Sequence, residues 1–214
     1  IGLAFNLKRV KPAGDGSHDE EAEYDAPTTI DAVEGAIHSY GYDVVRLEAT
    51  PDLLSRIASE PVDLVFNIAE GIRGRSREAF VPALLDLLDI PYTGSDAATL
   101  ALTLDKALAK QVVRQGGVPT PDFFVLQTGR ERLPPRVTWP LVAKPLAEGS
   151  SKGIAGSPVV HSEAELRARA ATLIERYRQP VIVEAFLPGR EFTVGLLGER
   201  RLRVLPPMEI VFLK

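Results

Sequence analysis

The chain contains no cysteine, only three histidines and a single tryptophan. The absence of cysteine excludes disulfide bonds, thiol catalysis and cysteine-ligated zinc. The histidines, His18, His38 and His161, lie far apart in polar stretches. We therefore expect all three to be surface residues, and we expect no histidine-based metal site.

Long apolar runs and excess positive charge are also missing. No run approaches the length of about 20 apolar residues that a membrane span needs, and no signal-peptide pattern is present. The net charge of −4 argues against nucleic acid as the main partner. The absence of cysteine is compatible with the cytoplasmic location that we expect. Because the chain begins at Ile1 and not at a methionine, we expect an N-terminal segment to be missing.

The apolar pattern predicts an α/β fold in which strands and helices alternate. A length of 214 residues with 45% hydrophobic and 25% charged residues fits one large or two small globular domains. The first half predicts strands over 1–6, 43–47, 62–68 and 91–94, and helices over 28–40, from Thr50-Pro51, and over 78–88. The face of helix 78–88 that we expect to be buried comprises Phe80, Val81, Leu84, Leu85 and Leu88.

The pattern changes near residue 95, where we place a domain boundary. The second half predicts a long helix over 96–115, strands over 123–126, 140–145 and 181–186, a helix over 163–177, a hairpin over 191–205 and a last strand over 210–213. Because a sheet rarely stops there, we expect the 214 residues to be a fragment.

The segment 139–153, WPLVAKPLAEGSSKG, carries the strongest chemical signal. It places Lys144 inside an apolar strand, where a charge is costly unless something pairs with it. The loop 148–153 offers glycine and serine backbone N–H groups, which suit a phosphate. This combination predicts a nucleoside triphosphate site, with Lys144 as the fixed charge and the loop as a flexible cover.

Six motifs in order carry a family resemblance over most of the chain from about Val62 onward. They are PYTGSD at 91–96, LDK at 104–106, GVPTP at 117–121, VAKPLAEGSSKG at 142–153, VIVEAFLPGREFTVGLLG at 181–198 and LPPMEIVF at 205–212. Each motif alone is weak, but the ordered set is strong. The chain resembles the D-alanine–D-alanine ligase family of the ATP-grasp superfamily.

The resemblance implies a Rossmann-like N-terminal domain over 1–95 and an ATP-grasp domain over 96–214. In the latter we expect a central subdomain over about 96–182 and the start of a C-terminal subdomain over 183–214. It implies an ATP-dependent, magnesium-dependent ligase of peptidoglycan (cell-wall) synthesis that joins amino acids through an acyl phosphate, often as a homodimer. The family's magnesium ligands would lie past residue 214, and Glu209 does not fit their motif, so no metal ligand is assigned here.

The resemblance also implies roles for single residues. Lys106 and Lys144 would hold the ATP phosphates, and the loop serines Ser150 and Ser151 would reach toward the substrate as catalytic residues. Glu184, with the following backbone, would recognise adenine, and Glu191 would bind the ribose hydroxyls. The full nucleotide-binding set is Lys106, Lys144, Glu148, Gly149, Ser150, Ser151, Gly153, Glu184, Ala185, Phe186, Leu187 and Glu191.

Each of these residues also has an ordinary structural interpretation. Lys106 could be a solvated lysine on a helix, and Lys144 could extend its amine out of the strand into solvent. The 148–153 segment could be a plain surface turn. Glu184 and Glu191 could face solvent from an edge strand.

Two regions depart from the family pattern, and both contact the first amino acid in the family. The Gly-rich loop after the first strand is absent, and the later histidine–glycine motif reads NIAEGIRGRSRE at 67–78. We therefore interpret the chain as a divergent member with an altered acceptor pocket. The candidate pocket residues are Glu23, Tyr24, Asn67, Glu70 and Arg75. Alternatively, Arg73, Arg75 and Arg77 form a solvated basic turn.

The departures leave two other functions open. One is an ATP-grasp dipeptide ligase of another pathway, which a screen of amino-acid pairs would distinguish. The other is a non-catalytic ATP-binding module, which would bind ATP without turning it over.

Overall fold

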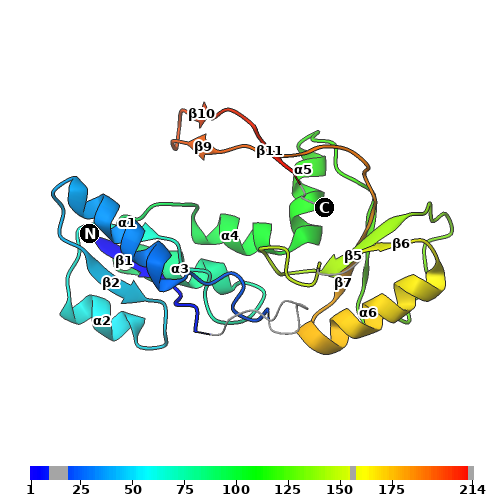
Figure 1. The fold of residues 1–214 in the computed structure, drawn as a ribbon, viewed down its shortest axis with the longest axis horizontal. Coiled ribbons are helices and arrows are strands. Elements are labelled where there is room, and N and C mark those ends of the chain that lie inside the picture. The colour runs from blue at the N-terminus through cyan, green and yellow to red at the C-terminus, as the bar shows by residue number, and fades with distance from the viewer. Residues whose placement is uncertain (10–18, 155–157, 212–214) are drawn as a thin grey trace.

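The computed structural model describes residues 1–9, 19–154 and 158–211. Two sheets occupy opposite ends of the molecule, and helices α4 (Ala97–Leu104) and α5 (Lys106–Gln115) lie between them (Figure 1). The first sheet is parallel with strand order β2-β1-β3, formed by β1 Gly2–Phe5, β2 Val45–Glu48 and β3 Val65–Asn67. All four residues of β1 are buried, as expected for the centre of a parallel sheet.

Helices cover both faces of this sheet. On one face, Leu3 and Phe5 form a cluster with Ile30 of α1 (Pro27–Ser39). On the other face, Leu47 and Val65 form a cluster with residues of α2 (Leu53–Ser59) and α3 (Phe80–Leu87). The alternation of side chains along each strand places the two clusters on opposite sides.

The second sheet is antiparallel with strand order β4-β7-β5-β6. Its strands are β4 Phe123–Leu126, β5 Leu141–Pro145, β6 Val159–Val160 and β7 Val181–Ala185. Helix α6 (Glu163–Tyr177) buries one face, where Ala143 and Val183 contact its apolar side. Because side chains alternate along a strand, Lys144 and Glu184 project from the opposite face. The register pairs Ala143 with Val183, so Lys144 and Glu184 are diagonal neighbours on adjacent strands.

The expected single helix over 96–115 is wrong, because the chain breaks at Asp105. Helix α4 spans Ala97–Leu104 and α5 spans Lys106–Gln115. Asp105 has extended backbone angles, φ −82° and ψ 99°, and its carboxylate accepts hydrogen bonds from the Ala107 and Leu108 N–H groups at 3.1 Å. Asp105 therefore caps a new helix, as an N-cap residue does, and Lys106 becomes the first residue of that helix.

The expected helix over 78–88 also differs from the structure. A 3₁₀ turn, η1 (Arg77–Ala79), precedes α3. Val81 and Leu85 are buried as expected, but Phe80 is 58% exposed and Leu88 is also exposed. The helix begins only at Phe80 and turns Pro82 into the core, so the buried face is rotated away from Phe80.

Three further expectations concern residues 91–94, the histidines and membrane-spanning helices. Residues 91–94 form an isolated bridge between Tyr92 and Val65 in place of a strand. His38 and His161 are exposed, whereas His18 lies outside the described residues. No helix within the described ranges is long and apolar enough to span a membrane.

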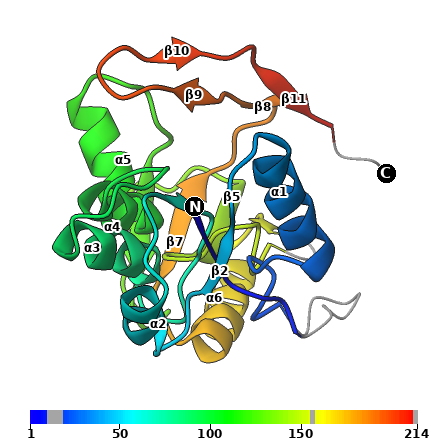
Figure 2. The ribbon, with the colours of Figure 1, turned by 90° about the vertical axis from the view of Figure 1, so that its left-hand side faces the viewer.

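An exposed arm follows β7. Strand β8 (Glu191–Thr193) pairs with β11 (Met208–Ile210), and β9 (Leu196–Leu197) pairs with β10 (Arg203–Val204), both antiparallel. The expected hairpin over 191–205 is confirmed in its inner part by β9 and β10, whereas residues 191–193 pair with β11. The expected strand over 210–213 overlaps β11 at Ile210, and residues 212–213 lie outside the described residues. Every residue of these four strands is exposed. Both views show the arm standing apart from the two sheets (Figures 1 and 2).

Candidate nucleotide and acceptor site

Glu184 lies between two lysines on the sheet face opposite α6. Its Oε1 is 3.0 Å from Lys144 Nζ, and its Oε2 is 3.5 Å from Lys110 Nζ. Lys110, on α5, also donates to Thr120 Oγ1 at 2.7 Å and stands 5.6 Å from the ring centre of Phe123. The lysine in the apolar strand therefore has the charged partner that a largely buried amine requires, and neither Glu184 nor Lys144 simply faces solvent.

Lys106 stands at the start of α5 and reaches toward the glycine–serine loop. Its backbone N–H donates to Leu146 O at 3.1 Å, and its Nζ donates to the carbonyls of Leu146 and Glu148. Burial, aided by the nearby charge of Lys144, lowers the pKa of Lys106 to about 8. It is therefore not a solvated helix lysine: a second largely buried amine faces the same loop.

The loop combines left-handed residues with close backbone approaches. Ser150 and Ser151 have φ of 43° and 60°, which non-glycine residues rarely adopt, and both are exposed. A Cβ on Gly149 would stand 2.5 Å from Glu23 Oε1, and one on Gly153 would stand 2.7 Å from Pro145 Cγ. Both glycines are therefore required where the loop meets its neighbours, while the two serines at its tip point to solvent.

Buried charges hold the two ends of this loop. Arg77 is 5% exposed, so the idea of a solvated basic turn is wrong for this residue. Its Nη2 donates to both oxygens of Glu23 at 2.9 and 2.8 Å, and its Nη1 donates to Ala147 O at 2.9 Å. Lys152 Nζ lies 2.6 Å from Glu148 Oε2 and 3.6 Å from Glu23 Oε2. Arg73 and Arg75 are exposed, as that interpretation expected.

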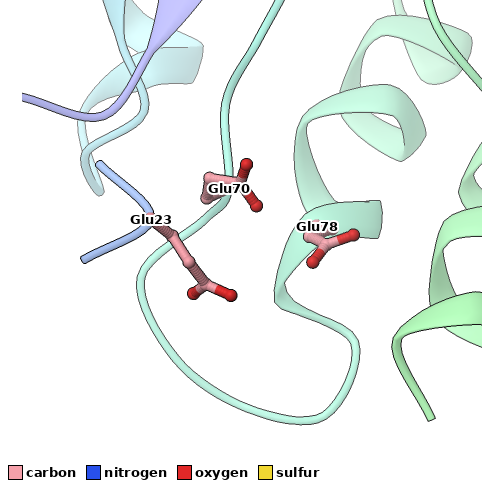
Figure 3. Close-up of side chains that lie close together, drawn as sticks. All are labelled: Glu23, Glu70 and Glu78. Carbon is pink, nitrogen blue, oxygen red and sulfur yellow. The ribbon is translucent and has the colours of Figure 1, made fainter. Parts of the chain in front are cut away.

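Three carboxylates from separate segments meet beside this network. Oxygens of Glu23, Glu70 and Glu78 lie within 4.8 Å of one another (Figure 3). Burial, reinforced by Glu78 and Glu23, raises the pKa of Glu70 to about 7. Burial also raises the pKa of Glu78. Such a cluster favours a proton or a cationic ligand, because each carboxylate disfavours ionisation of the others.

Two cavities flank the charged network. A cavity of about 410 Å³ is lined by Glu23, Asp25, Glu70, Glu78, Asn67 and neighbouring apolar residues. A cavity of about 760 Å³ is lined by Arg77, Glu148, Lys152 and further residues of both signs. The smaller cavity is therefore strongly acidic, and the Arg77–Glu23 pair forms part of the wall between the two.

The structure gathers most, but not all, of the predicted residues. Of the five acceptor candidates, Glu23, Asn67 and Glu70 line the smaller cavity. Tyr24 donates to Gly71 O at 3.1 Å and braces the loop after β3. Arg75 points elsewhere: it pairs with Asp105 at 2.9 Å and lines the larger cavity.

The adenine and ribose candidates follow β7. Glu184 is buried and Ala185 is half-buried, while Phe186 and Leu187 are exposed beyond the end of the strand. Glu191 is exposed on β8, and its partner across the ladder is Ile210. The roles of these residues, like those of Lys106, Lys144 and the loop, stay predictions.

Four residues of the site escaped the sequence reasoning: Lys110, Arg77, Glu78 and Lys152. Lys152 had a usable signal, since it lies inside the glycine–serine motif. Arg77 had none, because its partner Glu23 is 54 residues away.

The carboxylates near the loop do not fit a magnesium ion that bridges phosphates. Such an ion takes one or two carboxylates along with phosphate oxygens. Here Glu148 is taken by Lys152 and Gln179, and Glu23 by Arg77. Glu70 and Glu78 lie on the side of the acidic cavity. Among the described residues, two lysines therefore supply positive charge beside the loop, while the carboxylates next to it are engaged by other side chains.

Known proteins with similar sequences point to one family. The family model described as D-ala D-ala ligase C-terminus matches residues 112–214. The chain is 36% identical over 187 residues to the Sinorhizobium fredii protein y4sG, described as uncharacterized, covering 84% of the chain and 54% of that protein. It is 37% identical over 209 residues to D-alanine–D-alanine ligase B of Pseudomonas putida, covering 97% of the chain and 62% of that ligase.

A similar fold occurs in the crystal structure of D-alanine–D-alanine ligase from Bacillus anthracis complexed with ATP. It matches with a TM-score of 0.68 at 21% identity, over 99% of this chain and 66% of that one. At this identity the match shows the fold alone. The chain spans about half to three fifths of the length of the curated relatives named here. The matched family model, the sequence relatives and the fold together support this chain as a member of the D-alanine–D-alanine ligase family.

Proposed function

We propose that the protein is an ATP-dependent carboxylate–amine ligase that joins two amino acids. The observation that carries this proposal is that the largely buried Lys106 and Glu23 of the acidic cavity both contact the glycine–serine loop, with Lys144 near enough to Lys106 to lower its pKa. Lys106 and Lys144 suit phosphate oxygens as compact charges. The cavity lined by Glu70 and Glu78 suits the ammonium group of an amino acid.

The proposed chemistry has two steps. A substrate carboxylate oxygen attacks the γ-phosphorus of ATP, which yields an acyl phosphate and releases ADP. The amine nitrogen of the second substrate then attacks the acyl carbon, loses a proton and expels inorganic phosphate, leaving an amide. Positioning and charge stabilisation supply most of the catalysis, so the protein needs no nucleophile of its own.

In this proposal Lys106 and Lys144 bind the phosphates, and the loop 148–153 closes over them and excludes water. Backbone N–H groups and the hydroxyls of Ser150 and Ser151 then face the transferred phosphate. Glu184 and the segment after it recognise adenine, and Glu191 binds the ribose. Magnesium would come to the site with ligands other than the described residues. A homodimeric state and a cytoplasmic location belong to the same proposal.

The amino-acid pair need not be D-alanine with D-alanine. Four carboxylates, Glu23, Asp25, Glu70 and Glu78, line the smaller cavity. A basic amino acid or another amine-rich acceptor would be better matched to this charge than alanine. This observation favours a ligase of a pathway other than peptidoglycan synthesis as the second candidate.

The test is phosphate release from ATP and magnesium by the full-length protein, across pairs of D- and L-amino acids that include lysine and ornithine. We expect release that requires an amino-acid pair and disappears in Lys144→Ala. Arg136→Ala, at an exposed position, serves as the matched control and should retain activity. ATP binding without release for any pair would reject the ligase and favour a nucleotide-binding module.

A further inference from the structure

Arg77 touches the acceptor side and the nucleotide side of the site at once. Two segments that are distant in sequence meet at its guanidinium. One supplies Glu23, and the other supplies the carbonyl of Ala147 and the carboxylate of Glu148, whose Oε2 is 3.4 Å from Nη2. A planar guanidinium can satisfy several acceptors in different directions, which a lysine amine cannot do in the same geometry.

The charges around Arg77 balance. Arg77 and Lys152 supply two positive charges, and Glu23 and Glu148 supply two negative ones. All four side chains are no more than 11% exposed. Removing one partner from such a group leaves an uncompensated buried charge, which is costly in the low-dielectric interior. The four charges therefore remain compensated only while the parts of the chain that carry them stay in contact.

The network holds one end of the loop, and Asp19, outside the network, holds the other end. Glu23 Oε1 accepts the Gly149 N–H at 2.6 Å, and Asp19 Oδ2 accepts the Gly153 N–H at 3.2 Å. Between these two points, Ser150 and Ser151 are exposed in left-handed conformations. Arg77 sets the position of Glu23, and Glu23 in turn sets the position of Gly149.

We propose that Arg77 is a positioning residue that links the acceptor cavity to the loop covering the nucleotide, acting through Glu23 and Ala147–Glu148. This inference rests on the proposed function, in which both an acceptor and a nucleotide bind. A ligand that contacts Glu23 then changes the affinity for nucleotide, and the nucleotide changes the affinity for that ligand by the same factor. In this proposal Arg77 acts through Glu23 and the loop and not by contact with a substrate.

The first test needs no ligand. Hydrogen–deuterium exchange measured by mass spectrometry compares residues 147–153 with α6 as an internal reference. In Arg77→Met we expect exchange over 147–153 to rise about tenfold or more while α6 is unchanged, because the buried carboxylates lose their shared partner. Arg77→Lys should give an intermediate rise. Arg73→Met, at an exposed position on the same turn, is the matched control and should match the wild type.

A second variant keeps the proposal testable if Arg77→Met does not fold. Glu148→Gln removes one charge and retains the shape, so it should loosen the loop less than Arg77→Met. The pair Arg77→Lys and Glu148→Gln should be non-additive, since both act on the same network. Wild-type exchange over 147–153 in Arg77→Lys and Glu148→Gln would overturn the proposal, as would an equal rise in α6.

The third readout separates this proposal from the proposed function. In the full-length protein, Arg77→Lys should weaken binding of a non-hydrolysable ATP analogue several-fold and raise KM for ATP more than it lowers kcat. If the wild type binds the analogue and Arg77→Lys binds it with the same affinity, Arg77 does not link the acceptor cavity to the nucleotide loop. The ligase proposal would then remain intact. Failure of the wild type to bind nucleotide would reject the ligase, and the exchange result would still decide whether Arg77 positions the loop.

Discussion

Glu70 is the residue whose ionisation we expect to influence stability most clearly near neutral pH. Its pKa is raised from 4.5 to about 7 in the folded protein, chiefly by burial. The folded state therefore binds more protons than the unfolded state between these values. The contribution of Glu70 to stability is complete below about pH 4.5 and is lost as the pH rises through about 7.

Glu70→Gln should remove this pH dependence. At pH 8 we expect the variant to be more stable than the wild type by roughly 1–2 kcal/mol, after allowance for partial exposure of the carboxylate. At pH 4 the two should be nearly equal, because both side chains are then neutral. Urea unfolding at both pH values measures the difference, and Glu199→Gln on the exposed arm is the control. A stability gain of the same size at pH 4 and pH 8 would contradict ionisation as the cause.

At the scale of secondary-structure elements, the break between α4 and α5 decides where Lys106 stands. Asp105 is 4% exposed, caps two N–H groups of α5 and pairs with Arg75. Asp96 caps α4 through the Thr99 N–H at 2.7 Å but is exposed. The two aspartates therefore offer a matched comparison of a buried and an exposed cap.

Asp105→Ala should cost about 2 kcal/mol of unfolding free energy, and Asp96→Ala about 0.5–1 kcal/mol. Only Asp105→Ala should also weaken nucleotide binding, because the first turn of α5, which carries Lys106, loses its cap. Urea unfolding and titration with an ATP analogue measure the two effects. If both variants lose equal stability, the buried cap has no special role in joining the two helices.

At the scale of the whole molecule, the apolar arm is the feature that the rest of the described structure leaves uncovered. Leu196 and Val204 form a cross-strand pair and are 57% and 64% exposed. Neighbouring Leu197 and Leu202 are also more than half exposed. Exposed apolar side chains gathered on one hairpin are typical of an interaction site or of self-association.

We expect the isolated 214-residue chain to self-associate through this arm. The double variant Leu196→Glu with Val204→Lys places opposite charges across the ladder, so it keeps the pairing while removing the apolar surface. Sedimentation velocity over a range of concentrations should show less association for this variant. Leu54→Glu, at a 50% exposed position on α2, should leave association unchanged. Equal association of all three proteins would place the contact elsewhere.

Local patterns were sufficient for much of the fold and for part of the site. The strand that carries Lys144, helix α6 with its Ser162 cap, and the β9–β10 hairpin all depend on neighbours within a few residues. Lys144 could be recognised as a paired residue because a lysine inside an apolar strand needs a partner wherever the strand lies. The motifs also identified the family, since their order along the chain is itself sequence information.

The break at Asp105 and the burial of Arg77 could not be predicted in this way. Asp105 reads as one more helical residue until Arg75 and the adjoining loop meet it in space. Arg77 lies among other arginines, and nothing nearby distinguishes it from the exposed Arg73 and Arg75. The sequence by itself determined the strands, most of the helices and the residues that resemble a nucleotide site. Only the tertiary structure decided which charges are buried together. A buried charge needs an opposite charge close to it in space, and Glu23, Arg77 and Glu148 come close to one another only when the chain folds.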